Sequence, residues 1–132
     1  MMLQETITPR FSETDALGHI NNTVVPVWLE QARRPVFQLF TPDLDPEKWC
    51  LIVARIEINF LGELLYGHDV TIRTSVAKIG NTSFHLAQDI FQKAEIRAQG
   101  LAVLVHYDYQ RKQSIPIPND TRQQLEKFSF PI

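Results

Sequence analysis

One helical pattern followed by four long alternating stretches is the feature that most constrains the fold of this chain. Between positions 24 and 40, apolar residues recur at steps of three and four and form one stripe: Val25, Trp28, Leu29, Ala32, Val36, Leu39 and Phe40. From position 50 the apolar period becomes two, over ranges 50–61, 70–76, 82–92 and 95–110. An antiparallel sheet with an apolar face needs a cover, and this helix is the candidate.

The connections between the alternating stretches predict how the strands pair. Gly80-Asn81 and the pair at 93–94 have the lengths and positions of hairpin turns. A further strand is expected near the N-terminus, over 3–11. We therefore expect an α+β fold in which a curled five-stranded antiparallel sheet wraps around one long central helix. Pro35 cannot donate to the carbonyl of Gln31, so the pattern also predicts a kink or break near Arg34.

Length and composition narrow the class of protein. The 132 residues match a single domain over 1–132, and 44% hydrophobic with 21% charged residues is typical of a globular protein. The net charge of -2 provides no basic field for nucleic acid. Cys50, the single cysteine, excludes an internal disulfide and a cysteine-based zinc cluster. With no signal peptide and no apolar run of ~20 residues, we expect a cytoplasmic protein without a membrane partner.

Potentially reactive groups gather just before the predicted helix. Asp15, Gly18, His19, Asn21 and Asn22 fall within eight positions, in a loop that leads into the helical pattern. A loop carboxylate can attack a carbonyl or deprotonate water, and free N–H groups at a helix start can stabilise an oxyanion. Asn21 or Asn22 is expected to cap the helix, and Gly18 to allow a tight turn against a ligand.

Two other acids compete with Asp15 for the catalytic role. Glu13 lies two residues earlier, and in an extended segment both side chains would point the same way. Glu30 lies on the polar side of the helix, four residues before Arg34, so a solvated ion pair is the favoured interpretation.

The segments in this order resemble the hotdog-fold thioesterases of the 4-hydroxybenzoyl-CoA thioesterase family, over essentially the whole chain. The core of the resemblance is Arg10-Phe11-x-Glu13-Thr14-Asp15-x-x-Gly18-His19-Ile20-Asn21-Asn22, followed by Trp28-Leu29-Glu30 and Ala32-Arg33. Supporting matches are Ile58-Asn59-Phe60-Leu61, Tyr66-Gly67, Lys78-Ile79-Gly80 with Ser83, and Ile115-Pro116-Ile117-Pro118.

The resemblance implies a function and a site. It implies an acyl-CoA thioesterase in which Asp15 is the nucleophile or general base and the backbone N–H of Asn22 polarises the thioester carbonyl. His19 matches the histidine that takes part in catalysis in plant acyl-carrier-protein thioesterases, whereas Leu17 replaces their asparagine. Ser83 matches a polar position near the active site of relatives.

The resemblance also implies how the substrate and partners are arranged. Relatives join two protomers through their sheets and often pair the dimers again, so a homodimer or homotetramer is expected, with acyl-CoA along the dimer interface. Lys78 is one candidate, among several cations, for the coenzyme A phosphates. Coenzyme A is then part of the substrate, and neither a separate cofactor nor a metal is expected.

Two rival functions fit the same fold. An enoyl-CoA hydratase would also use a loop acid and a nearby histidine, but the Asp-x-Asn-Pro-x-His pattern of those enzymes is not met between Asp15 and His19. A non-catalytic acyl-CoA binding protein would bind the ligand without turning it over.

Overall fold

The computed structural model describes residues 2–129. Its elements follow the order β1 (Leu3–Ile7), a 3-10 turn η1 (Phe11–Glu13), α1 (Val24–Ala32), α2 (Arg34–Phe40), a second 3-10 turn η2 (Pro46–Lys48), β2 (Leu51–Phe60), β3 (Val70–Ile79), β4 (Ser83–Gln92), β5 (Glu95–Asp108), β6 (Gln113–Ser114) and α3 (Asn119–Glu126). No helix within residues 2–129 is long and apolar enough to cross a bilayer.

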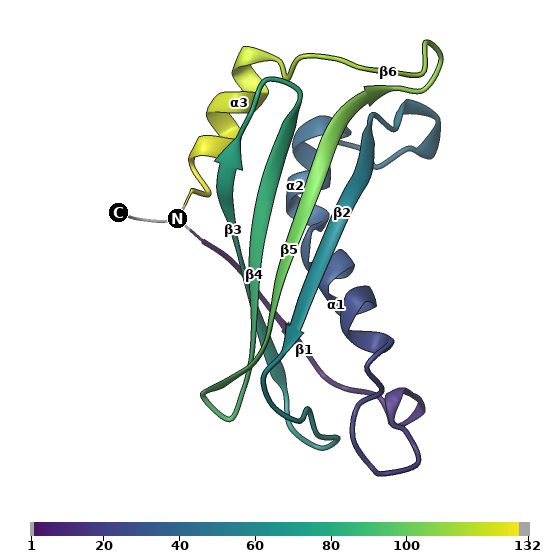
Figure 1. The fold of residues 1–132 in the computed structure, drawn as a ribbon, viewed down its shortest axis with the longest axis vertical. Helices are drawn as coiled ribbons and strands as arrows, with labels where there is room; N and C mark the ends of the chain where they lie inside the picture. Colours follow the sequence, from purple (N-terminus) through teal and green to yellow (C-terminus); the bar gives the residue numbers. More distant parts are fainter. Residues whose placement is uncertain (1, 130–132) are drawn as a thin grey trace.

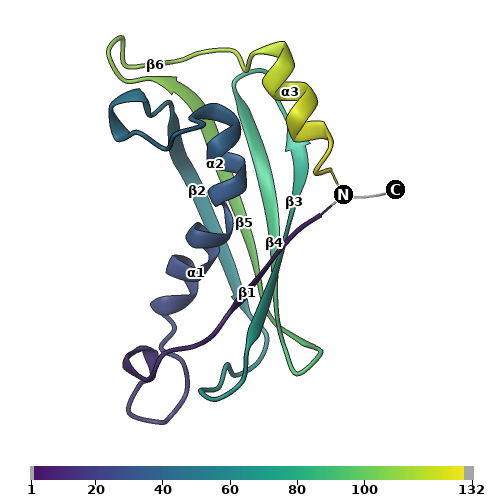
Figure 2. The same cartoon turned by 180° about the vertical axis from the view of Figure 1, so that it is seen from behind.

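The strands form a curved antiparallel sheet that holds α1 and α2 on one face (Figure 1). The order across the sheet is β1-β3-β4-β5-β2, and the short β6 pairs with the end of β5. Seen from behind, α1 and α2 run along the sheet and α3 covers the end of β3 (Figure 2). The predicted five-stranded core of the sheet and its wrapping around a helical layer are confirmed, with β6 as a small addition.

The predicted single long helix is divided into two. Helix α1 ends at Ala32, α2 begins at Arg34, and Arg33 lies between them. Pro35 occupies the first turn of α2, where its missing N–H costs nothing. The break expected from Pro35 is therefore confirmed, and the covering layer is two consecutive helices instead of one continuous helix.

Arg33, at the break, turns inward. Its side chain is 2% exposed, and Nε donates to Oε1 of Gln88 over 3.1 Å. The Gln88 amide in turn donates to the carbonyl of Leu29 and to Oγ1 of Thr74. Burial lowers the pKa of the Arg33 guanidinium below its ordinary value. These hydrogen bonds between buried polar groups connect the end of α1 to the middle of the sheet.

A bulge divides the apolar residues of β2 between the two faces of the sheet. Uninterrupted alternation over 50–61 would place Ile52 and Ile56 on one face, but they lie on opposite faces because the pairing register with β5 shifts between Val53 and Arg55. Ile52 pairs with Val105 on the face away from the helices. Ile56, Ile58 and Phe60 lie on the helix side. They pair in that order with Ala102, Gly100 and Ala98 of β5.

Strand β2 is the edge of the sheet, and this leaves apolar side chains exposed. Ile56 is 47% and Phe60 52% exposed although both lie on the helix side of the sheet, and α1 approaches β5 at Gly100. A Cβ on Gly100 of β5 would come within 2.8 Å of Leu29 of α1, which shows how close that approach is.

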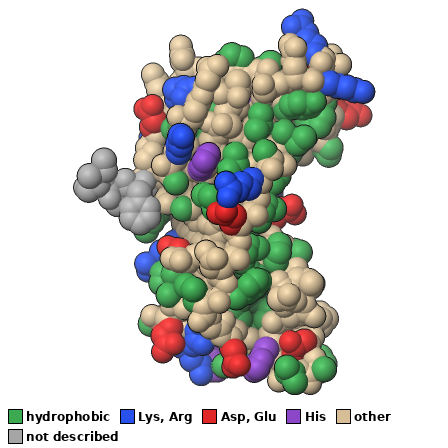
Figure 3. All heavy atoms as spheres, in the orientation of Figure 1, with side chains coloured by type: hydrophobic (Ala, Val, Ile, Leu, Met, Phe, Trp, Pro, Cys, Tyr) green, Lys and Arg blue, Asp and Glu red, His purple; other side chains and the backbone are tan. Residues whose placement is uncertain are grey.

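The opposite face of the sheet mixes apolar and charged side chains (Figure 3). In β5 the apolar residues buried beneath the helical layer are Ala98, Ala102 and Leu104. Leu101 and Val103, which also follow the predicted alternation, lie half-buried on the outer face. The alternating pattern therefore identified the strand, while the small residues of β5 mark the face that contacts α1.

Candidate active site

A pocket of about 270 Å³ lies where the loop before α1 meets the segment after β2. Its lining includes Asp15, His19 and Asn22, so the structure brings together the three predicted catalytic residues. The segment after β2 closes the other side with Glu63 and Leu64. In Figure 1 this corner lies at the lower end of the molecule, below the first turn of α1.

The Asp15 carboxylate is held by the backbone of its own loop. Oδ1 accepts from the N–H of Leu17 over 2.8 Å and from the N–H of His19 over 3.2 Å. Within residues 2–129, Oδ2 accepts no hydrogen bond from protein. Gly18 makes the turn possible with φ +80°, a conformation that glycine adopts without strain. The loop thus fixes one carboxylate oxygen and leaves the other available.

The start of α1 lies slightly later than predicted. Asn21 Oδ1 accepts from the N–H of Thr23 over 2.9 Å and from its hydroxyl, which forms a turn that leads into the helix. Thr23, rather than Asn21 or Asn22, flanks the first helical residue, and its side chain makes no capping bond. Asn22 is exposed in this turn, and within residues 2–129 its backbone N–H has no hydrogen-bond acceptor.

His19 contacts Asp15 through its backbone and a third residue through its ring. Its carbonyl accepts from the Asp15 N–H over 2.8 Å, in addition to the bond from its own N–H to Oδ1. The ring Nε2 lies 3.3 Å from Oε2 of Glu63. The loop geometry around Asp15 therefore depends on the His19 backbone, while the imidazole lines the pocket beside Glu63.

Glu13 is turned away from the pocket into the protein. It is 8% exposed, and Oε2 accepts from the indole N–H of Trp28 over 2.9 Å. Burial raises its pKa, but hydrogen bonds from the Arg10 N–H and from Trp28 outweigh that effect and hold the pKa below its usual value. The hypothesis that Glu13 and Asp15 point the same way is wrong, because the 3-10 turn over Phe11–Glu13 replaces an extended segment.

The residues predicted to bind substrate lie in two places. Gly18 is in the Asp15 loop but outside the lining of the pocket. Lys78 and Ser83 flank the β3–β4 turn, at the opposite end of the sheet from Asp15 (Figure 1). One protomer therefore does not bring Lys78 and Ser83 together with the Asp15 pocket.

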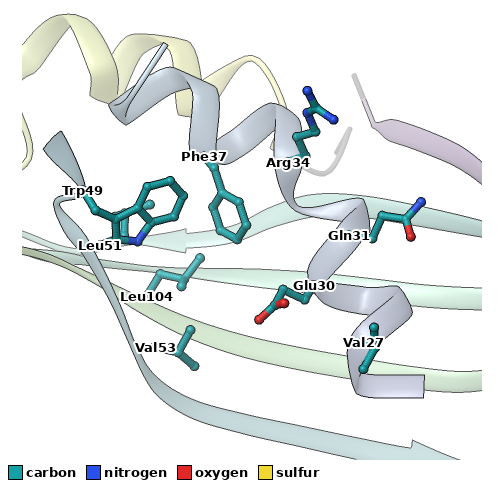
Figure 4. A pocket seen from close by; sticks show the side chains of 9 residues that line it. All are labelled: Val27, Glu30, Gln31, Arg34, Phe37, Trp49, Leu51, Val53 and Leu104. Carbon is teal, nitrogen blue, oxygen red and sulfur yellow. The ribbon is translucent and has the colours of Figure 1, made fainter. Parts of the chain in front are cut away.

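A larger groove of about 500 Å³ continues along the helix side of β2 (Figure 4). Its walls come from α1, α2, the segment before β2, β2 itself and β5: Val27, Glu30, Gln31, Arg34, Phe37, Trp49, Leu51, Val53 and Leu104. Both hollows lie along the same seam between the helices and β2. Val25 and Phe60 line the Asp15 end of the seam, and Val27 and Val53 line the groove.

The predicted ion pair between Glu30 and Arg34 does not form within residues 2–129. In Figure 4 the Glu30 carboxylate points into the groove toward Val53, whereas the Arg34 guanidinium points away from it. The helix break at Arg33 lies between the two residues, so they no longer have the spacing of one continuous helix. Within the described part of the chain Glu30 therefore makes no salt bridge, although its charge raises the pKa of the neighbouring Arg33 against the effect of burial.

Two features of the site could not be obtained from the sequence pattern. Phe60 and Glu63 lie 45 and 48 residues after Asp15, and nothing in the sequence spacing predicts that they contact the same pocket. Trp28 carried a usable signal, since a buried indole N–H needs an acceptor, but the sequence does not name Glu13 as that acceptor. Within residues 2–129 no group of three or more His, Cys, Asp and Glu side chains could hold a metal ion.

Comparisons with known proteins identify the family and the fold of the chain. A family model described as the thioesterase-like superfamily matches residues 9–125. The uncharacterized protein YsmA of Bacillus subtilis (strain 168) is 25% identical over 80 residues, which span 61% of this chain and 54% of that relative. The matched segment thus spans about half the length of that curated relative.

Solved structures match the whole fold. A predicted thioesterase from Bacillus stearothermophilus is 41% identical, with a TM-score of 0.97 over 100% of this chain and 99% of the other. A thioesterase from Thermus thermophilus, solved with coenzyme A and Zn, is 30% identical, with a TM-score of 0.83 over 92% and 95%. A 4-hydroxybenzoyl CoA thioesterase mutant, complexed with 4-hydroxybenzoyl CoA, is 15% identical and shares the fold with a TM-score of 0.80 over 94% and 98%. The prediction of a hotdog-fold thioesterase is confirmed, and the chain belongs to the thioesterase-like superfamily.

Proposed function

We propose that the protein is an acyl-CoA thioesterase that uses Asp15 as its catalytic carboxylate. The proposal is supported by one observation: in the same pocket lie an Asp15 oxygen and the N–H of Asn22, neither of which has a hydrogen-bond partner among residues 2–129. A carboxylate and a free backbone donor on either side of a carbonyl are the minimum needed for thioester hydrolysis. The coenzyme A complex of the Thermus thermophilus relative supports the choice of substrate.

The reaction has two routes that use the same groups. Asp15 attacks the thioester carbon, a C–O bond forms, and the C–S bond breaks with coenzyme A leaving as a thiolate. Water then hydrolyses the mixed anhydride, which frees the acid and Asp15 and supplies the proton that the thiolate takes up. Alternatively Asp15 takes a proton from water, and the hydroxide attacks while the coenzyme A thiolate leaves and is protonated. Both routes develop negative charge on the carbonyl oxygen, which the Asn22 N–H stabilises. His19 is proposed to hydrogen-bond the substrate, a role supported by its position in the lining of the pocket beside Glu63.

The acyl group is proposed to lie in the groove along β2. The groove volume of about 500 Å³ is within the range of ligand sites, and its walls are mainly apolar. Along α1, the backbone rises ~9 Å over the six residues from Val24 to Glu30, so the groove begins within reach of an acyl chain held at Asp15. Glu30 would then lie beside the distal part of that chain.

A second copy of the chain is proposed to pair with the edge of β2. This strand is ten residues long and exposes Ile52, Val53, Ile56 and Phe60, a combination that invites strand pairing. Antiparallel pairing of two β2 edges would bring the far end of one sheet toward the Asp15 end of the other. That arrangement would give Lys78 and Ser83 of the partner protomer a route to the coenzyme A part of the substrate.

The experiment that tests this function measures thiol release from a panel of acyl-CoA substrates with the purified full chain. The panel varies chain length and includes aromatic and hydroxylated acyl groups. The proposal predicts stoichiometric release of coenzyme A and free acid from at least one member. Hydration of crotonyl-CoA without thiol release would indicate a hydratase instead, and tight acyl-CoA binding without turnover would indicate a binding protein.

A further inference from the structure

We propose that Glu13 is a positioning residue that fixes the Asp15 loop against α1, with Trp28 as its anchor. The inference rests on the proposed function, because it explains how the two groups assigned to catalysis keep their relative placement. It concerns a buried carboxylate that lies two residues from Asp15 and takes no part in the chemistry.

The anchor is a hydrogen bond between two buried side chains. Oε2 of Glu13 accepts from Nε1 of Trp28 over 2.9 Å, and the two residues are 8% and 2% exposed. Trp28 belongs to the core cluster that joins α1 to the sheet, so its ring cannot move without disturbing that core. A charged acceptor in such surroundings gives a stronger and shorter bond than a neutral one. Glu13 is therefore attached to a fixed point on α1.

The same residue holds both ends of the loop. Oε1 accepts from the N–H of Arg10 over 2.7 Å, where the chain enters the 3-10 turn. The backbone carbonyl of Glu13 accepts from the N–H of Asn21 over 2.8 Å, where the chain leaves the loop. Asp15 lies two residues after Glu13, and Asn22 directly follows Asn21. Glu13 thus holds both the segment with the Asp15 carboxylate and the segment with the Asn22 N–H at a fixed position relative to α1.

A positioning role and a purely stabilising role predict different consequences. Loosening the loop would change the distance between Asp15 and the Asn22 N–H, and misplacement of catalytic groups by ~1 Å can cost about a hundredfold in rate. Lower stability alone would leave the kcat of the folded enzyme unchanged. Trp28→Phe separates the two roles. It keeps a buried aromatic ring at position 28 and removes only the indole N–H that donates to Glu13, together with some side-chain volume.

The kinetic test compares Trp28→Phe with Leu125→Val, a control in the buried face of α3 at the far end of the molecule. Both variants are assayed well below their melting temperatures. We expect kcat to fall roughly ten- to a hundredfold in Trp28→Phe with KM within about twofold, and both constants to stay near wild type in Leu125→Val. A Trp28→Phe enzyme with wild-type kcat would overturn the proposal.

A second test does not require activity. Amide hydrogen exchange of Asp15 and Asn21, whose N–H groups bond to His19 and Glu13, reports the order of the loop directly. Exchange should be at least tenfold faster in Trp28→Phe than in Leu125→Val, and equal exchange would refute the proposal. In Glu13→Gln, the indole N–H signal of Trp28 should shift while that of Trp49 stays in place. If the wild type hydrolyses no acyl-CoA, the proposed function fails, but exchange still decides the role of Glu13.

Discussion

The carboxylate of Asp15 is joined to His19 through the backbone and not through the imidazole. Oδ1 of Asp15 accepts from the His19 N–H over 3.2 Å, and the Asp15 N–H donates to the His19 carbonyl over 2.8 Å. The imidazole lies instead 3.3 Å from Glu63. Replacing the side chain at position 19 therefore leaves the hydrogen bonds that hold Asp15 intact.

This arrangement predicts that His19→Ala keeps measurable activity. We expect a loss of about ten- to a hundredfold in kcat/KM, from the missing imidazole contact to substrate, and a far larger loss in Asp15→Asn. Steady-state kinetics with one acyl-CoA substrate would measure both. Equal losses in the two variants would show that the imidazole is as essential as the carboxylate.

The lowered pKa of Glu13 predicts loss of stability in acid. A carboxyl whose folded pKa lies below its unfolded value contributes stability that is fully present above the unfolded pKa, ~4.3, and is lost as pH falls through the lower folded value. Glu13→Gln cannot titrate, so it should be less stable than wild type at pH 7, and the difference should shrink below about pH 4. Chemical denaturation across pH 3–7 measures this. A difference that stays constant would contradict the role of the ionised carboxylate.

The Glu30 carboxylate that points into the groove predicts a bias in acyl selection. An acyl group that ends in a carboxylate would place a second negative charge in the groove beside Glu30, at a cost on the order of 1 kcal/mol at ~4 Å in water. Glu30→Gln should therefore raise kcat/KM for such substrates about fivefold relative to unsubstituted acyl-CoA of equal length. Glu126→Gln, an exposed change on α3, is the matched control. No change in the ratio would place the acyl chain outside the groove.

The exposed apolar edge of β2 predicts self-association. Ile56→Lys puts a charge among the exposed apolar residues of that edge and should convert the assembly to monomers, as measured by sedimentation velocity. Gln123→Lys adds the same charge on the exposed side of α3 and should not change the sedimentation coefficient. An assembly unaffected by Ile56→Lys would have to use another surface.

The fold was predictable wherever local periodicity and turn chemistry agree. The alternation from Val70 to Val76 and the Gly80-Asn81 turn located the β3–β4 hairpin, and Pro35 located the break between the helices. The bulge in β2 was not predictable, because Ala54 carries no signal that distinguishes a bulged residue from a paired one. Its consequence, the division of Ile52 and Ile56 between two faces, follows from backbone pairing alone.

The candidate site was predictable in its loop and not in its surroundings. Asp15, His19 and Asn22 lie close in sequence, so their meeting in one pocket requires only a turn at Gly18. By sequence position Glu13 resembles a second catalytic acid, but the 3-10 turn directs its side chain toward Trp28. The hydrogen bond between these two residues spans fifteen positions of the sequence. Contacts of this kind depend on tertiary packing that no local pattern encodes.

The most direct test of the central claim is the rate of coenzyme A release by Asp15→Asn compared with wild type. The substitution preserves size and the hydrogen bonds to Oδ1 but removes the charge, so circular dichroism and sedimentation should match wild type. We expect kcat to fall at least a hundredfold, the scale of base or nucleophilic catalysis. A folded Asp15→Asn protein that releases coenzyme A at the wild-type rate would contradict it.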